Sequence, residues 1–112
     1  MLKSWFVGLV ILSGLAAEGR AGGFINGHQL LEMCTDESAQ QVCLAYVAGV
    51  FDQLDVPGNN IGGITLCIPP SKNISQLKDV VIEFLRKNPE MRQYVAATSV
   101  DVAWRWAYPC GH

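Results

Sequence analysis

This chain of 112 residues contains four cysteines, and they constrain its fold more than any other feature. They are Cys34, Cys43, Cys67 and Cys110. Each lies downstream of an apolar N-terminal stretch, at the expected end of a helix, and four cysteines in a small exported domain predict two disulfides. Structural zinc is the alternative, but close Cys-x-x-Cys pairs are missing and histidine is limited to His28 and His112. We therefore expect a helical domain with two disulfides and no metal site.

Residues 1–21 have the features of a secretory signal peptide. Lys3 supplies a positive charge, residues 5–17 form an apolar stretch, and small residues follow. An apolar core of about 13 residues is short for a membrane span, which needs about 20. The sequence predicts that residues 1–21 are removed, although cleavage after Ala16 or Ala17 also fits. Residues 22–112 then form one mature domain without a membrane anchor; an uncleaved anchor is the alternative.

The charge pattern argues against a nucleic-acid partner. The chain has 8 basic and 10 acidic side chains, a net charge of −2. Phosphate binding needs clustered Lys and Arg, whereas in the mature domain only Arg86 and Lys87 are adjacent. The mild acidity would suit a basic protein partner, but in a domain of this size it is more often a solubility feature.

Apolar residues recur at helical spacing and predict an all-α protein, a small four-helix bundle. The first helix begins at Gly27 and is interrupted at residues 35–37. The second starts close behind, with Ser38 and Gln41 as a candidate capping box, and is apolar nearly all round. We expect the second helix to be packed on several sides, with Gly49 allowing another helix to approach closely.

Two further helices are expected after the irregular segment that follows the second. The third opens with Asn73 and Gln76 as cap candidates. Its apolar stripe comprises Ile74, Leu77, Val80, Val81, Phe84 and Leu85. Its outward-facing residues are expected to be Lys78, Asp79 and Glu83. The fourth helix runs from Pro89 to Pro109. Its predicted buried face comprises Met91, Tyr94, Val95, Thr98, Val102 and Trp106.

These placements select the disulfide pairing. Cys34 closes the first helix and Cys43 lies in the early turns of the second, so a tight antiparallel corner brings them within bridging range. Cys67 precedes the third helix and Cys110 follows the fourth. Two antiparallel helices place those outer ends on the same side. We therefore expect the pairs Cys34–Cys43 and Cys67–Cys110.

The sequence predicts no catalytic residue and no cofactor. A hydrolase needs a nucleophile with a base in reach, and oxidised cysteines cannot serve. His28 and His112 lie at the two ends of the mature domain. Asp52 and Asp55 share a helical face and mimic a carboxylate pair, but they fall beside a loop, where carboxylates are solvated, without an acid/base partner.

One residue and one segment are candidates for contacting a partner protein. Trp104 lies off the predicted buried stripe of the fourth helix, and an exposed tryptophan often anchors an interface. The Gly-rich segment 55–66 is the longest irregular one and could project into a cleft. Its candidate contact residues are Asn59, Asn60 and Ile61. A connector without any contact role is the alternative for this segment.

Five short motifs carry a family resemblance through their order and spacing. They are Gly27-His-Gln-Leu30 leading to Cys34, Cys43-Leu-Ala-Tyr46-Val-Ala-Gly49, Cys67-Ile-Pro69, Phe84-Leu85 leading to Asn88-Pro89-Glu90, and Tyr108-Pro109-Cys110. Together they resemble the Rap/Tai immunity proteins, which protect bacteria against peptidoglycan amidases delivered by type VI secretion. The resemblance spans nearly all of the mature chain. Family members often have histidine where this chain has Asn88, and phenylalanine where it has Tyr108.

The resemblance implies a periplasmic, all-helical protein, often a homodimer, that binds a cell-wall amidase effector and blocks its active-site cleft. Such a protein inhibits without chemistry of its own. The shared cysteine, tyrosine, glycine and proline positions carry over as structural residues. Two alternatives remain: a small exported disulfide-bonded chaperone or stress-binding protein, and a family member without any toxin partner.

Overall fold

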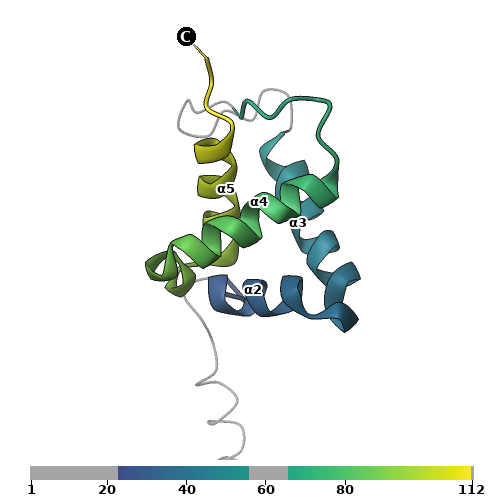
Figure 1. Ribbon diagram of the computed structural model, residues 1–112, viewed down its shortest axis with the longest axis vertical. Helices are drawn as coiled ribbons and strands as arrows, with labels where there is room; N and C mark the ends of the chain where they lie inside the picture. The colour runs from purple at the N-terminus through teal and green to yellow at the C-terminus, as the bar shows by residue number, and fades with distance from the viewer. Residues whose placement is uncertain (1–22, 56–65, 112) are drawn as a thin grey trace, which may run out of the picture.

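The computed structural model describes residues 23–55 and 66–111, and within them the protein is all-α (Figure 1). The four α-helices are α2 (Gly27–Thr35), α3 (Gln40–Leu54), α4 (Ile74–Lys87) and α5 (Ala96–Ala107). Two 3₁₀ helices, η1 (Glu37–Ala39) and η3 (Pro89–Gln93), connect α2 to α3 and α4 to α5. The expected all-α, four-helix fold is therefore confirmed.

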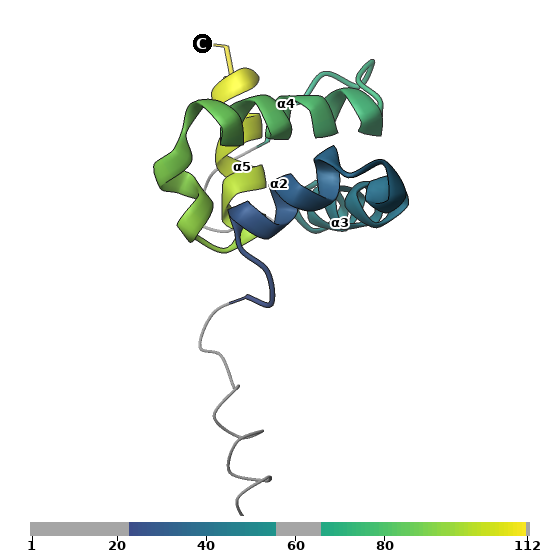
Figure 2. The same cartoon turned by 60° about the horizontal axis from the view of Figure 1, so that its bottom comes forward.

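The helices cross one another instead of lying parallel. In Figure 1, α5 stands upright, α2 runs across below its lower end, and α4 passes diagonally in front of α5. Figure 2 shows α4 lying along one side of α2 and α3. Every pair of these α-helices is in contact, so the core lies where all four meet. None of the helices in the described ranges is long and apolar enough to span a membrane.

Asparagine side chains begin two of the helices. The Asn26 side chain accepts from the backbone N–H of Gln29, whose side chain accepts from the N–H of Asn26. Asn73 and Gln76 make the same reciprocal pair at the start of α4. Each capping box satisfies backbone donors that a helix start leaves unpaired. The cap predicted at Asn73 is confirmed, whereas the one at Asn26 was not predicted.

The capping box predicted at Ser38 and Gln41 is wrong. Helix α3 begins after Ala39 without a side-chain cap. Asp36 instead accepts from the backbone N–H of Ser38 and from its hydroxyl, at 2.9 and 2.8 Å, and this turn opens η1. The hydrogen bonds from Ser38 lower the pKa of Asp36. Ser38 thus sits inside the connecting turn, where its side chain is already paired.

The hydrophobic core draws on all four α-helices. Its buried members are Leu30, Cys34, Cys43, Val47, Leu77, Val81, Leu85, Ala96, Val100, Ala103 and Trp104. The stripe predicted for α4 is confirmed, because its members are either buried or packed against this core. Of the residues expected to face outward from α4, Asp79 and Glu83 are exposed, but the Lys78 side chain is only 16% exposed.

The buried face predicted for the last helix is wrong. Tyr94, Val102 and Trp106 are 50%, 37% and 76% exposed. The residues actually buried on α5 are Ala96, Ser99, Val100, Ala103 and Trp104. The reason is a break in the helix: η3 and an extended Tyr94–Val95 segment precede α5, and Val95 forms an antiparallel bridge with Asn26. The break rotates the side of α5 that faces the core, and three of its five buried residues, Ala96, Ser99 and Ala103, are small.

The close approach between segments occurs at Gly27, not at Gly49. A Cβ atom on Gly27 would lie 2.7 Å from the Cα of Arg92, so η3 can pack here only against a glycine. A Cβ on Gly49 would meet nothing within 4 Å, and the expectation of a close helix contact there is wrong. Helix α3 is packed along Cys43 and Val47, but Val42 is 58% exposed. One side of α3 is therefore uncovered.

Both predicted disulfides are present. Cys34–Cys43 joins α2 to α3 with a Cα–Cα distance of 5.0 Å, and Cys67–Cys110 joins the segment before α4 to the segment after α5 with a Cα–Cα distance of 5.2 Å. By loop-closure entropy these cross-links stabilise the fold by about 3 and about 4 kcal/mol. No thiol is free in the described residues.

Candidate functional site

The exposed tryptophan of α5 is Trp106, not Trp104. Trp104 is fully buried, and its indole N–H donates to the carbonyl oxygen of Leu77 in α4 at 3.1 Å. Phe51 of α3 packs edge-on against it, with ring centroids 5.9 Å apart. Trp104 therefore joins three elements of the core and offers no surface to a partner. The exposure predicted for Trp104 is wrong, because α5 starts at Ala96 and turns this side chain inward.

Trp106 borders a groove between α4 and α5 with a volume of about 250 Å³. Its lining residues are Val80, Glu83, Phe84, Lys87, Asn88, Ala103, Trp106 and Ala107. Helix α4 contributes the large apolar side chains Val80 and Phe84, whereas α5 contributes the small Ala103 and Ala107. Because alanine fills little space, the two helices meet with a hollow between them. We call this the α4–α5 groove.

Charged side chains border one side of the α4–α5 groove. The ammonium of Lys87 lies 2.7 Å from the carboxylate of Glu83, and both side chains are 65% exposed. The hydrogen bond and charge of Lys87 lower the pKa of Glu83. An ion pair this exposed contributes little stability. Its charges remain accessible to a partner.

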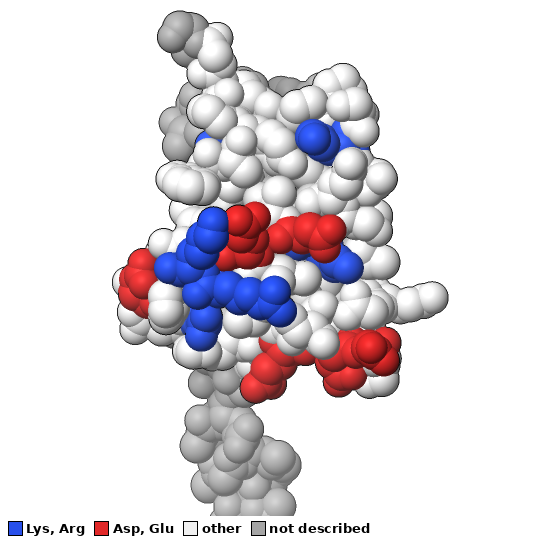
Figure 3. All heavy atoms as spheres, in the orientation of Figure 1, with Lys and Arg blue, Asp and Glu red and all other residues white. Residues whose placement is uncertain are grey.

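Basic side chains gather at the C-terminal end of α4 (Figure 3). Arg86 and Lys87 belong to its last turn and Arg92 to the following η3. The guanidinium of Arg92 donates to the carbonyl oxygens of Leu85 and Arg86, at 2.7 and 3.2 Å. Cations near the C-terminus of a helix are favoured by its dipole. The cluster thus has a structural cause, and of its three members only Lys87 lines the α4–α5 groove, whereas Arg86 borders a separate hollow beside Cys34 and Thr35.

A second apolar surface lies on the uncovered side of α3. This hollow of about 450 Å³ is lined by Ala45, Tyr46, Gly49, Val50, Gln53, Leu54 and Ala97. Partial burial raises the pKa of Tyr46, and a hydrogen bond with the backbone of Ala97 opposes this. We call this surface the α3 face. Its small residues, Ala45 and Gly49, would let another helix approach closely.

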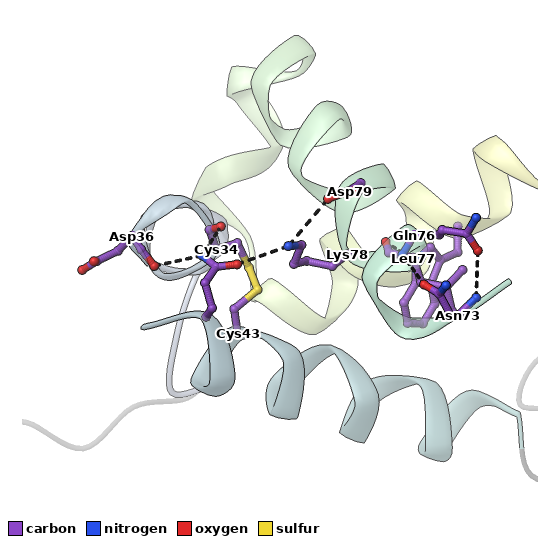
Figure 4. Close-up of polar contacts among 10 residues, drawn as sticks. Cys34, Asp36, Cys43, Asn73, Gln76, Leu77, Lys78 and Asp79 are labelled. Carbon is purple, nitrogen blue, oxygen red and sulfur yellow. Dashed lines mark hydrogen bonds and ion pairs between the residues drawn. A yellow bond between two sulfur atoms is a disulfide. The ribbon is translucent and has the colours of Figure 1, made fainter. Parts of the chain in front are cut away.

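A polar network closes the corner between α2 and α3 (Figure 4). The Gln40 side-chain amide donates to the carbonyl oxygens of Cys34 and Asp36, at 2.8 and 2.9 Å. Its own oxygen accepts from the ammonium of Lys78 at 3.2 Å, and Asp79 lies 3.7 Å from that ammonium. The network pairs the last carbonyls of α2 and links them to α4. Every member has a structural partner, so we assign it to stability.

The other candidate residues are not brought together. Asn59, Asn60, Ile61 and His112 lie outside the described residues. His28, Asp52 and Asp55 are exposed, and the two aspartates are not joined to any acid/base partner in the described interactions. Among the residues that the structure describes, no group of three or more His, Cys, Asp or Glu could hold a metal ion.

The geometry describes a small, disulfide-bonded helical protein whose apolar hollows are suited to contact with another protein. Residues 26–110 match the family of Rap1a immunity proteins, and the chain belongs to this family. Membership confirms the resemblance carried by the five sequence motifs. It indicates an immunity function and implies that the protein binds a toxin effector; such immunity proteins are generally non-enzymatic. No curated protein and no solved structure matches the chain.

Proposed function

We propose that this protein is exported to the periplasm, where it binds a peptidoglycan amidase delivered by type VI secretion and blocks its active site. The observation that carries the proposal is the family match over residues 26–110, which covers both disulfides and all described helices. The two disulfides support export, because they form and persist in oxidising compartments. The apolar N-terminal stretch supports the same route.

The α3 face supports homodimerisation as part of this proposal. Val42, Ala45 and Gly49 form an exposed strip of apolar and small residues on α3. Two copies related by a twofold axis would bury the same strip against each other. Gly49→Glu places a carboxylate there without a steric clash, since a Cβ on Gly49 meets nothing within 4 Å. Light scattering of this variant should show a monomer where the parent protein is a dimer; equal masses would remove the α3 face as the interface.

Inhibition of a purified amidase tests the function directly. The oxidised protein is titrated against a panel of type VI peptidoglycan amidases while release of cleaved peptidoglycan is measured. We expect stoichiometric inhibition of one amidase, with a Kd in the nanomolar range typical of specific complexes of standard size, about 10⁻⁷ to 10⁻¹⁰ M. Inhibition of none, combined with suppression of aggregation of unrelated unfolded proteins, would favour the exported chaperone instead.

Compartment dependence supplies the second test. The amidase is directed to the periplasm of a host cell, and this protein is co-expressed either with residues 1–21 or without them. Protection from lysis should require residues 1–21, because the substrate of the amidase is outside the cytoplasm. Equal protection by both forms would contradict a periplasmic site of action.

A further inference from the structure

Trp106 is the large exposed aromatic side chain at the edge of the α4–α5 groove. It is 76% exposed, and Ala103 and Ala107 beside it leave the hollow open. Tryptophan is enriched among residues that dominate protein–protein binding, particularly next to a pocket that can be desolvated. An indole beside an apolar hollow therefore indicates a contact surface for another protein.

The size of the groove indicates what it can receive. Sites for small organic ligands usually enclose about 300–1,000 Å³. The α4–α5 groove, at about 250 Å³, is below this range, and its apolar lining comes from only a few side chains. A groove of this volume accommodates one bulky apolar side chain of a partner. Such an anchor would pack against Trp106 and Phe84.

The groove is held in shape before any partner arrives. The buried indole of Trp104 donates to Leu77 and fixes α5 against α4 from inside the core. The Cys67–Cys110 disulfide holds the chain just after α5, and the N–H of Tyr108 donates to the carbonyl oxygen of Trp104 at 2.8 Å. A preorganised surface loses little conformational entropy on binding. The two helices that form the groove therefore need little rearrangement to bind a partner.

The charges beside the groove favour a carboxylate on the partner. Lys87 donates to Glu83, but an ammonium has three donors, and the Lys87 side chain is 65% exposed. Arg86 and Arg92 do not line the groove, but they lie at the same end of α4, where the neighbouring carboxylates are those of Glu83 and Glu90. Cations therefore outnumber carboxylates there, and one carboxylate is already paired with Lys87. An acidic side chain would be attracted to this end of the groove.

We propose that the α4–α5 groove binds a segment of the effector that presents one bulky apolar side chain beside an acidic residue. The apolar side chain occupies the hollow next to Trp106, and the carboxylate pairs with Lys87. This inference rests on the proposed function for the identity of the partner, while the chemistry of the groove stands on its own residues.

Affinity measurements with the amidase that the parent protein inhibits provide the first test. Trp106→Ala should weaken binding by about 30-fold or more, as expected for a residue that dominates an interface. Tyr94→Ala is the matched control, because it removes an aromatic side chain that is 50% exposed outside the groove. We expect this control to change the affinity by less than about threefold. Equal affinities of the parent protein and Trp106→Ala would overturn the proposal.

Two further variants separate shape from charge. Ala107→Phe fills the hollow while leaving Trp106 in place, and it should weaken binding without lowering the thermal midpoint. Lys87→Glu should weaken binding by about tenfold, with most of the loss disappearing at high salt. Unchanged affinity in Ala107→Phe would exclude occupation of the hollow. A change in self-association with unchanged amidase affinity would assign the groove to a second copy of this chain and overturn the proposal.

A peptide titration tests the groove without an amidase. The probe is a short acetylated peptide with one central phenylalanine between two aspartates, added to the ¹⁵N-labelled oxidised protein. Shifts should appear at the Trp106 indole N–H and at the backbone of Phe84 and Ala103, and should vanish when alanine replaces the phenylalanine. If no amidase binds but these shifts occur, the proposed function fails and the groove proposal stands. Shifts that are absent, or equal for both peptides, overturn the groove proposal.

Discussion

The α2–α3 corner and the α4–α5 pair are both closed by a disulfide, but the contacts that hold them differ in range. At the corner, Cys34–Cys43 spans 9 residues, and Gln40 bonds to a carbonyl 6 residues away. In the pair, Cys67–Cys110 spans 43 residues, and Trp104 bonds to a carbonyl 27 residues away. The corner is therefore closed mainly by local contacts, with the bond from Lys78 to Gln40 linking it to α4, whereas the contacts that close the pair join residues far apart in the chain.

The two regions also differ in what they leave exposed. The corner satisfies its polar groups through Gln40 and Lys78, and the pair buries Trp104 while leaving Trp106 and a hollow at the surface. Long-range packing thus gave α5 both the largest fully buried side chain of the described residues, Trp104, and a highly exposed aromatic one, Trp106. The following changes test how far this contrast extends.

Replacing the two tryptophans should give the largest difference. Trp104→Ala removes a fully buried indole and its hydrogen bond to Leu77, and should lower the free energy of unfolding by about 3–5 kcal/mol. Trp106→Ala removes an exposed side chain and should change it by less than about 0.5 kcal/mol. Urea unfolding followed by circular dichroism measures both. Similar losses in the two variants would show that the assignment of inside and outside on α5 is wrong.

Removing each disulfide compares the two regions directly. The Cys67→Ser/Cys110→Ser double variant should lose about 4 kcal/mol and the Cys34→Ser/Cys43→Ser variant about 3 kcal/mol, because the longer loop gains more entropy in the unfolded chain. Denaturant midpoints under identical conditions provide the measurement. A larger loss from opening the short loop would mean that native contacts at the corner, and not chain entropy, dominate its stability.

Gln40→Ala probes the polar network at the corner. It removes the donor to Cys34 and Asp36 and the acceptor for Lys78, whose side chain is only 16% exposed. We expect a loss of about 1–3 kcal/mol, the cost of leaving such groups unpaired. Gln41→Ala is the matched control, since Gln41 is an exposed neighbour on the same helix. A loss as large in the control would attribute the effect to helix α3 in general.

The ion pair beside the α4–α5 groove should have the smallest effect. Lys87 lowers the pKa of Glu83 below its ordinary value of 4.5, so the stabilisation is present above pH 4.5 and is lost as the pH falls through the lowered pKa. Lys87→Ala should remove this contribution, so the free energy of unfolding of the variant should fall less steeply as the pH is lowered through the acidic range. The pKa of Glu83, followed by NMR, should return toward 4.5 in the variant. An unchanged pKa would show that the pair does not persist in solution.

The features that were predicted correctly from the sequence depend mainly on residues that lie close together in the chain. The Asn73 capping box, the apolar stripe of α4 and the disulfide at the corner each depend on residues close together in the chain, and each was predicted. The Cys67–Cys110 pair was also predicted, since a sharp turn between two helices is a local signal that brings their outer ends together. Membership of the immunity family was accessible for a similar reason, because short motifs in a fixed order carry it.

The candidate site was harder to predict from the sequence. The expectation that Trp104 is exposed assumed one continuous helix from Pro89, whereas Asn26 pairs with Val95 and breaks it. Nothing near Val95 in the chain signals that partner, which lies at the other end of the domain. The small residues Ala96, Ser99 and Ala103 recur at helical spacing and mark a buried side of α5. They do not separate the two tryptophans, because Trp106 follows Ala103 by three residues and so lies near this stripe, whereas Trp104 lies about 100° from Ala103 around the helix.

Local patterning was thus enough to predict that four helices form, the disulfide pairing and the family, since caps, apolar periodicity and turn residues act within a few positions. The packing of four helices around Trp104 decided which side of α5 faces the core. It also decided where alanines on α5 leave a hollow against α4. A helix has the same internal hydrogen bonds whichever side is buried, so its orientation is set by the surfaces that it meets.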